Sequence, residues 1–298
     1  MQLTQRTLPL LTLLQAGGLC RRVPGWSRIL SMLFPAREQA AGHVEVTQWG
    51  LTYLANPANY IDWNVLCLGA YEPDDLRMLA RHAPPHAVCL DVGANIGHHS
   101  LFFAAQGWRV HAFEPNPQVW PEFEAKVAAS GLRTITLNKV GLGDTETVLD
   151  FELESASNSG TGRFRLDGEE TAGSVAVGKL PIRNGDQFLR EAGISRVDVI
   201  KMDIQGFEPE ALAGLRETIA RDHPLLCVEI SEESARKLGS FEAFRALFPE
   251  GYSFKTQRLE LRGLVRRPVV APYAGEGFFS LHENLFCFPP AKPERPSR

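Results

Sequence analysis

Short apolar runs and longer amphipathic stretches alternate along the middle of the chain, and this alternation predicts strands and helices in turn. The continuous apolar run 87–90 predicts a strand that is buried on both faces of a parallel sheet. The next segment places Leu101, Phe102, Ala104 and Ala105 toward that sheet, as a packed helix does. Residues 109–114 predict a second strand. Residues 86–116 therefore form a βαβ unit with a glycine-bearing turn.

The same pattern continues on both sides of this unit. It predicts a hairpin or edge strand at 44–55, helices at 61–68 and 73–82, and a helix from 117 to 130. Further strands are expected at 134–142, 147–153, 174–181, 197–203, 225–230, 252–261 and 285–289, with helices at 186–192 and 232–248. Residues 155–173 are polar and rich in glycine, which predicts a long functional or mobile loop. We expect an α/β fold with an open, mostly parallel seven-stranded sheet and helices on both faces. The division is a helical extension at 1–48, one domain at 49–290 and a disordered tail at 291–298.

The turn after the first strand indicates which nucleotide could bind. A dinucleotide site needs G-x-G-x-x-G, but here Asn95 stands between Gly93 and Gly97, where a side chain hinders the approach of phosphate. Asp91 adds a negative charge, which favours the ammonium and sulfonium of S-adenosylmethionine over a pyrophosphate. Glu114, at the tip of the second strand, is placed to accept hydrogen bonds from ribose hydroxyls. The alternative is an ordinary βαβ unit whose acids only cap its strands.

Ionisable residues also gather at the ends of two later strands. Lys201 and Asp203 alternate on one face of a strand, Glu208 opens the next helix, and Glu229 ends the following strand. The three acids are candidate bases for an alcohol acceptor, and Lys201 either lowers their pKa or acts itself. The acids could instead bind a divalent metal, although no dedicated ligand set is visible and we predict none. A structural ion pair and a helix cap are the simpler alternatives.

Four sequence motifs identify a family resemblance. DVGANIG (91–97), AFEPNP (112–117), IKMDIQGFE (200–208) and VEIS (228–231) resemble the FkbM family of S-adenosylmethionine-dependent methyltransferases, over residues 49–231. The resemblance implies the class I methyltransferase, Rossmann-like fold and S-adenosylmethionine as cofactor. The resemblance, together with the position of acids and turns at the strand ends, predicts a cofactor site. Its candidate residues are Glu72, Asp91, Gly93, Ala94, Asn95, Gly97, Glu114, Pro115, Asn116, Val140, Gly141, Leu142 and Asp203.

The resemblance also covers two flanking elements and one departure. GAYE, with Tyr71 and Glu72, is similar to a family element that precedes the first core strand and lies beside the cofactor; Glu72 could equally be a helix-start acid. The Asn158-Ser159-Gly160 segment resembles a family element on the substrate side. Gln205 replaces an acid that is typical of the family, so it is not expected to act as a base.

The composition limits the partners and the cellular location that we expect for the protein. The chain has 298 residues, 44% of them hydrophobic, and a net charge of -4, which gives no general attraction to nucleic acid. Five scattered cysteines predict reduced thiols and a cytoplasmic location. Residues 8–20 are apolar and flanked by arginines, so this segment could contact a membrane surface. Arg262, Arg266 and Arg267 form a basic cluster that is either solvated surface or a contact for an anionic substrate.

These observations together predict an O-methyltransferase. DIQG follows the fourth core strand in place of the Asn/Asp-Pro-Pro-aromatic motif of nucleobase-amine methyltransferases, which favours an oxygen acceptor. The resemblance points to hydroxyls of sugars, glycans, glycolipids or polyketide-like natural products. The rivals are a nicotinamide-dependent sugar oxidoreductase or epimerase and a catalytically silent binding protein. His98 and His99 open the first helix, where histidines are commonly solvated; contact of either one with the substrate is the alternative.

Overall fold

The computed structural model describes residues 42–155, 158–165, 174–262, 265–281 and 283–290, together with Met32. The tail predicted at 291–298 and most of the N-terminal extension, with its apolar segment and Cys20, lie outside the described residues. The first described element is a hairpin of β1 (Val44–Gln48) and β2 (Leu51–Ala55), which crosses the boundary that we predicted at residue 48. No helix in the described ranges combines the length and apolar character needed to cross a bilayer.

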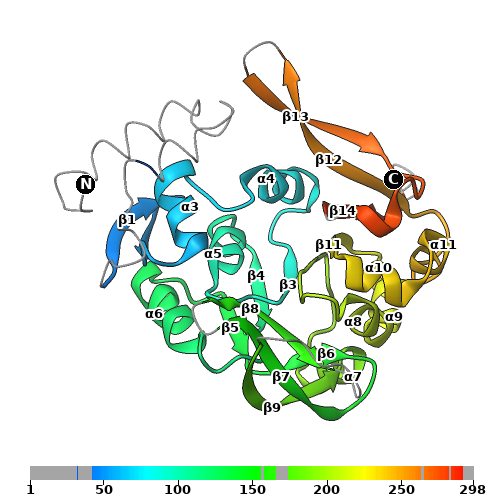
Figure 1. Cartoon of the computed structure of the whole chain (residues 1–298), viewed down its shortest axis with the longest axis horizontal. Helices are drawn as coiled ribbons and strands as arrows, with labels where there is room; N and C mark the ends of the chain where they lie inside the picture. Colours follow the sequence, from blue (N-terminus) through cyan, green and yellow to red (C-terminus); the bar gives the residue numbers. More distant parts are fainter. Residues whose placement is uncertain are drawn as a thin grey trace, which may run out of the picture.

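One large sheet runs through the molecule (Figure 1). Its order is β13-β12-β14-β11-β10-β3-β4-β5, with β3 Val88–Val92, β4 Arg109–Phe113, β5 Ile135–Asn138, β10 Val199–Met202, β11 Leu225–Ile230, β12 Ser253–Arg262, β13 Val265–Pro272 and β14 Glu283–Phe288. The five strands from β11 to β5 pair in parallel, and β14, β12 and β13 are antiparallel. The predicted fold class is confirmed, but the predicted number of seven strands was wrong. Pro268 and the arginines of β13 concealed the eighth strand, which is an edge strand and therefore tolerates proline.

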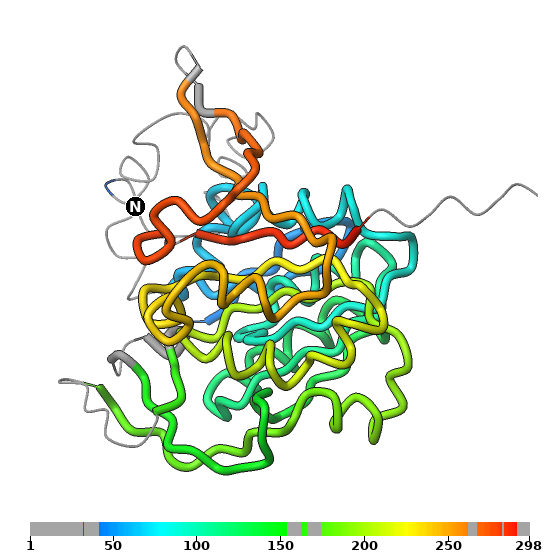
Figure 2. The backbone as a smooth tube through the Cα atoms, turned by 90° about the vertical axis from the view of Figure 1, so that its right-hand side faces the viewer, coloured from blue at the N-terminus to red at the C-terminus, as the bar shows by residue number. Residues whose placement is uncertain are grey.

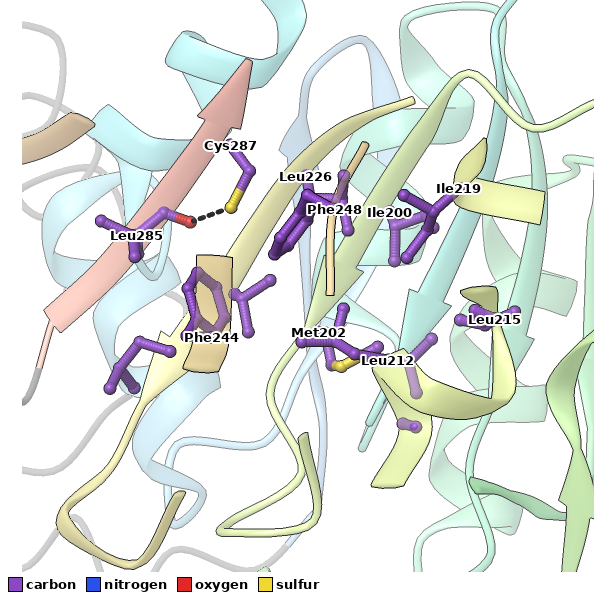
Figure 3. Packing of buried hydrophobic residues seen from close by; sticks show 14 of the residues in the cluster. Ile200, Met202, Leu212, Leu215, Ile219, Leu226, Phe244, Phe248, Leu285 and Cys287 are labelled. Carbon is purple, nitrogen blue, oxygen red and sulfur yellow. Dashed lines mark hydrogen bonds between the residues drawn. The ribbon is translucent and has the colours of Figure 1, made fainter. Parts of the chain in front are cut away.

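Helices cover both faces of this sheet. One face carries α4 (Pro73–His82), α5 (His98–Ala105) and α6 (Trp120–Ser130), whose apolar side chains pack on Cys89, Val110 and Ala112. The other face carries α7 (Gly185–Glu191), α8 (Glu208–Gly214), α9 (Arg216–Asp222), α10 (Glu232–Leu238) and α11 (Phe241–Arg245). Figure 3 shows part of this second core, where Leu212, Leu215 and Ile219 lie beside the strands.

Two predicted elements are divided in the structure. The single helix expected at 232–248 is broken into α10 and α11, because Gly239 ends α10 in a left-handed conformation and Ser240 caps α11. The single strand expected at 134–142 is also two strands, β5 and β6 (Gly141–Gly143), and the two lie in different sheets.

A second sheet of four strands lies beside the main one. Its order is β6-β9-β7-β8, with β7 Thr147–Ser155, β8 Asn158–Arg165 and β9 Val175–Asn184. Part of the long loop predicted at 155–173 is therefore strand β8, and the predicted Asn158-Ser159-Gly160 element lies in it, although these side chains are outside the described residues. In Figure 2 this green sheet lies at the opposite end of the molecule from the orange β12–β13 hairpin.

The strand order reverses beside β3. The chain moves outward from β3 through β4 to β5, returns, and then moves the other way from β10 to β11. In open α/β sheets, ligands bind outside the carboxyl ends of the strands at such a reversal. The α3 helix (Tyr60–Leu68) and the β1–β2 hairpin pack beside α5 and α6 near this point (Figure 1). The fold thus places a binding crevice at the ends of β3, β4 and β10.

Candidate functional site

A pocket of about 200 Å³ lies at this reversal. Its lining comes from the turns after β3, β4 and β10, from α3 and the start of α5, and from the second sheet. The candidate cofactor residues that line it are Gly93, Ala94, Asn95, Glu114, Pro115, Asn116, Gly141, Leu142 and Asp203. The structure therefore brings nine of the thirteen candidates around one cavity.

The turn after β3 is shaped for close packing. Gly93 has φ +84°, and a Cβ there would lie 1.9 Å from the carbonyl oxygen of Asp203 in the turn after β10. Gly97, also at φ +84°, packs against the ring of Phe123 and is not a lining residue. Asn95 adopts φ +49°, a left-handed conformation that asparagine tolerates better than most residues. The two glycines thus serve backbone geometry, and Asn95 is the polar side chain that the turn presents at the pocket.

Glu114 is held rigidly in the pocket wall. Its Oε1 accepts the backbone N–H of Asn116 and its Oε2 accepts that of Asn95, both at 2.8 Å. Burial raises the pKa of Glu114 to about 7, although these two hydrogen bonds oppose the shift. Each oxygen keeps a second lone pair, so the carboxylate can still accept hydrogen bonds from a ligand.

Asp91 is buried at the end of β3 and only half satisfied. Its Oδ2 accepts the hydroxyl of Ser100 at 2.5 Å, while its Oδ1 has no hydrogen-bond partner among the described residues. Burial raises the pKa of Asp91, because the charged form has lost its water. An orphaned carboxylate oxygen of this kind is costly unless a donor or a cation from a ligand satisfies it.

Lys201 and Asp203 form an ion pair at the end of β10, which was the simpler alternative to a catalytic role for them. Lys201 Nζ lies 3.3 Å from Asp203 Oδ2 and 4.0 Å from Glu72 Oε2, and the lysine is almost fully buried. Burial alone would lower the pKa of Lys201, but the charges of Asp203 and Glu72 outweigh it and raise that pKa well above its ordinary value. Burial likewise opposes ionisation of Asp203, yet the Lys201 ammonium holds the pKa of Asp203 well below its usual range. A charged lysine and so weak a carboxylate base are poorly suited to removing a proton.

Glu229 lies next to this pair and is neutral near pH 7. Burial and the charge of Asp203 raise the pKa of Glu229 to about 9. Gln205 donates from Nε2 to Asp203 Oδ1 at 3.0 Å and to Glu229 Oε2 at 3.1 Å, so this residue has a hydrogen-bonding role. A neutral carboxyl group cannot act as a base. Glu229 instead helps to hold Asp203 in place, because Gln205 donates hydrogen bonds to both.

Glu208 is directed at its own chain rather than at the pocket. Its Oε1 accepts the N–H of Ile204 at 2.8 Å, and its Oε2 accepts the N–H of Gly206 at 3.0 Å and the hydroxyl of Ser234. Burial raises the pKa of Glu208 to about 7, and the residue is not among those that line the pocket. One oxygen each of Glu208, Asp203 and Glu229 lie within 4.8 Å of one another. The hydrogen bonds already made by Glu208 fix the turn of residues 203–206.

The remaining candidates lie around the pocket or behind it. Val140 is partly buried against the main core and does not line the cavity. Glu72 is at the N-cap position of α4 with φ +48°, makes no capping bond, and directs its carboxylate toward Lys201 and His99.

Of the predicted basic cluster, the side chains of Arg262 and Arg266 lie outside the described residues, and Arg267 is exposed. Cys67, Cys89, Cys227 and Cys287 are free and buried, as predicted.

Two groups of lining residues are not among the candidate site residues predicted from the sequence. Phe151 and Phe164 of the second sheet and Phe207 before α8 form an aromatic roof, with ring centroids 5.1 and 5.4 Å apart. For Phe151 and Phe164 the signal was the alternation of apolar and polar residues around them. His98 and His99 also line the pocket and are buried rather than solvated. Their position at the start of the helix after the glycine turn was the signal for them.

Comparison with known proteins gives the family. Residues 91–255, more than half of the chain, match the family model described as Methyltransferase FkbM domain. This match confirms the resemblance found in the motifs.

The curated relatives are matched over part of their length. The chain is 28% identical over 149 residues to the hexuronic acid methyltransferase AglP of Haloferax volcanii, covering 50% of this chain and 58% of that protein. It is 26% identical over 211 residues to the AMB antimetabolite synthetase AmbE of Pseudomonas aeruginosa, covering 60% of this chain and 10% of that protein. Among solved structures, a methyltransferase FkbM from Methylobacillus flagellatus KT has a TM-score of 0.42 at 18% identity, covering 63% of this chain and 44% of that one.

Proposed function

Because the chain belongs to the FkbM methyltransferase family, we propose that it is an S-adenosylmethionine-dependent O-methyltransferase acting on a hydroxyl of a sugar, a glycan or a related natural product. The observation that carries the proposal is the set of acids at the strand ends. Two carboxylates, Glu114 and Asp203, line the pocket, and the orphaned oxygen of Asp91 lies at the end of β3.

The residues present fit S-adenosylmethionine as the methyl donor. Glu114 would hold its ribose hydroxyls, since both carboxylate oxygens are fixed by backbone N–H groups and keep free lone pairs. Asp91 Oδ1 would be satisfied by its ammonium group. Leu142 and Phe113 supply apolar walls for its adenine. When bound, this donor supplies a methyl group on a sulfonium, and the chain contributes binding and orientation.

The lining favours a neutral acceptor oxygen over an anionic one. The name of the Haloferax volcanii relative specifies a hexuronic acid, which offers both hydroxyls and a carboxylate. Among the described residues that line this pocket there is no lysine or arginine, whereas Asp203 is ionised and Glu114 becomes ionised above about pH 7. An acceptor carboxylate would therefore meet repulsion without a cationic partner. This supports a hydroxyl acceptor, and the aromatic roof suits the apolar face of a sugar ring.

Isothermal titration calorimetry of the purified chain tests the proposal. We expect S-adenosylmethionine and S-adenosylhomocysteine to bind in the micromolar range, and NADH not to bind. Binding of NADH in place of both sulfur nucleosides would refute the proposal and favour the oxidoreductase alternative. Incubation of radiolabelled donor with methyl glycosides then shows whether label is transferred to neutral sugars or to uronic acids.

A further inference from the structure

The two adjacent histidines at the start of α5 have different surroundings. His98 uses both ring nitrogens within the fold: Nε2 accepts the N–H of Tyr71 at 3.1 Å, and Nδ1 lies 3.2 Å from the hydroxyl of Tyr53. That hydroxyl donates its proton to Asp62 at 2.6 Å, so His98 must donate from Nδ1. Burial lowers the pKa of His98 well below its usual value. His98 is therefore a neutral structural residue.

His99 instead has one nitrogen beside a carboxylate and one available. Its Nε2 lies 3.3 Å from Glu72 Oε2, at ion-pair distance, although neither atom makes a hydrogen bond within the described part of the chain. The Nδ1 of His99 makes none there either. The ring lines the pocket, stacked at a tilt beside Tyr71 with centroids 6.0 Å apart. A carboxylate facing Nε2 favours the tautomer that carries its proton there, which leaves the lone pair of Nδ1 available.

Glu72 is held in place for this contact at a conformational cost. It adopts φ +48°, which is unfavourable for a glutamate, at a helix N-cap position where its side chain makes no capping bond. Its Oε1 accepts from Asn284 at 3.3 Å, and Lys201 lies 4.0 Å from its Oε2. Burial disfavours the charge of Glu72, but Lys201 outweighs it and lowers the pKa of Glu72. The partner of His99 is thus an ionised and oriented carboxylate.

We propose that His99 is the general base of the methyl transfer and that Glu72 is its positioning residue. This inference rests on the proposed function and extends it to the proton-transfer step. The acceptor hydroxyl gives its proton to Nδ1 of His99 while its oxygen forms the new O–C bond. The C–S bond of the donor breaks, and its electron pair stays on sulfur as a neutral thioether. The imidazolium so formed is stabilised by Glu72, as in other carboxylate–histidine pairs.

The other charged groups around His99 support the same direction of proton transfer. Asp91 at the end of β3 and Asp203 after β10 both interact electrostatically with His99, and both are acids. Together with Glu72 they stabilise a positive ring, while neutral His98 adds no charge. Lys201 is the opposing cation, and Asp203 lies 3.3 Å from it. By contrast, Glu208 is bound to its own turn and Glu229 is neutral near pH 7.

The first experiment reads the ring directly, without an acceptor. Long-range ¹H–¹⁵N NMR of the full chain, saturated with S-adenosylhomocysteine, identifies the histidine tautomers, and His99→Gln assigns the signal. We expect His99 as the Nε2–H tautomer with bare Nδ1, and a loss of that preference in Glu72→Gln. An Nδ1–H tautomer in the unaltered protein would overturn the proposal whether or not an acceptor is found.

The second experiment distinguishes a role of His99 as the base from a role of His99 in binding the methyl donor. With a methyl glycoside that accepts label, His99→Gln should lower kcat by about 10²- to 10⁴-fold, with the Kd for S-adenosylmethionine unchanged. Glu72→Gln should lower kcat less, because it removes the positioning residue and keeps the base. His111→Gln, on β4 and away from the pocket, is the matched control. Full activity of His99→Gln, or a loss confined to donor affinity, contradicts the base role. Absence of donor binding in the unaltered chain refutes the proposed function instead.

Discussion

Replacement of Glu114 by Gln tests the donor site most sharply. The substitution keeps the size of the side chain but exchanges one acceptor oxygen for an NH₂ group that faces a backbone N–H at 2.8 Å. A hydrogen bond to a charged acceptor contributes about 1.5–3 kcal/mol, so loss of one ribose contact should weaken donor binding by about 10- to 150-fold. Glu124→Gln, on the exposed face of α6, should leave affinity unchanged.

The pH dependence of binding provides a second measure of the same residue. With the pKa of Glu114 at about 7 in the free protein, the carboxylate form is about one eleventh of the molecules at pH 6 and about ten elevenths at pH 8. A ligand that needs the charged form therefore binds about tenfold more weakly at pH 6 than at pH 8, and near pH 7 its binding releases a proton.

Calorimetry in buffers of different ionisation enthalpy measures both quantities. We expect proton release near pH 7 in the unaltered chain and a flatter pH dependence in Glu114→Gln. An unchanged Kd in the variant, or a ligand-bound crystal in which Glu114 points away from the ribose, would refute the assignment.

Three further predictions concern the scaffold and the acid cluster. Gly93→Ala should lower the melting temperature far more than Gly131→Ala. A Cβ at residue 93 would lie 1.9 Å from the carbonyl oxygen of Asp203, whereas a Cβ at residue 131 would meet no atom within 4 Å. Differential scanning calorimetry measures both melting temperatures. Lys126→Met should lower the free energy of unfolding, measured by urea denaturation, by about 3–5 kcal/mol, because it leaves the buried carboxylate of Asp62, 2.6 Å from the ammonium, without a charged partner. Lys139→Met removes an exposed ion pair and should lower the same free energy by less than about 1 kcal/mol. Glu229→Gln should change kcat less than about threefold at pH 7, because that carboxyl group is already neutral; a large loss measured with labelled donor would contradict this.

The side of the pocket that we propose for the donor was predictable, because local rules determine its structure. Buried parallel strands are continuous apolar runs, so the residues that end them, Asp91 and Glu114, could be placed at one edge of the sheet from the sequence. The alternation of strand residues likewise put Lys201 and Asp203 on one face, where they form an ion pair at 3.3 Å.

The side of the pocket that we propose for the acceptor depends on contacts between distant segments. The burial of His98 requires Tyr53, which lies 45 residues earlier in a hairpin whose docking no local pattern indicates. From the sequence, Glu208 could be a base or a helix cap. Its carboxylate is occupied partly by the hydroxyl of Ser234, which lies 26 residues later in the chain. The glycine and serine content of β8 also masked a strand that exists through its pairing with β7.

The pocket is lined by residues of both sheets. The acids that suit the donor stand at the ends of β3, β4 and β10, whereas Phe151 and Phe164 come from β7 and β8. Under the proposed function, lengthening, shortening or exchanging the β7–β8 hairpin would change the space around the acceptor and leave the acids at the strand ends in place. Engineering of new acceptor specificities should then begin with that hairpin.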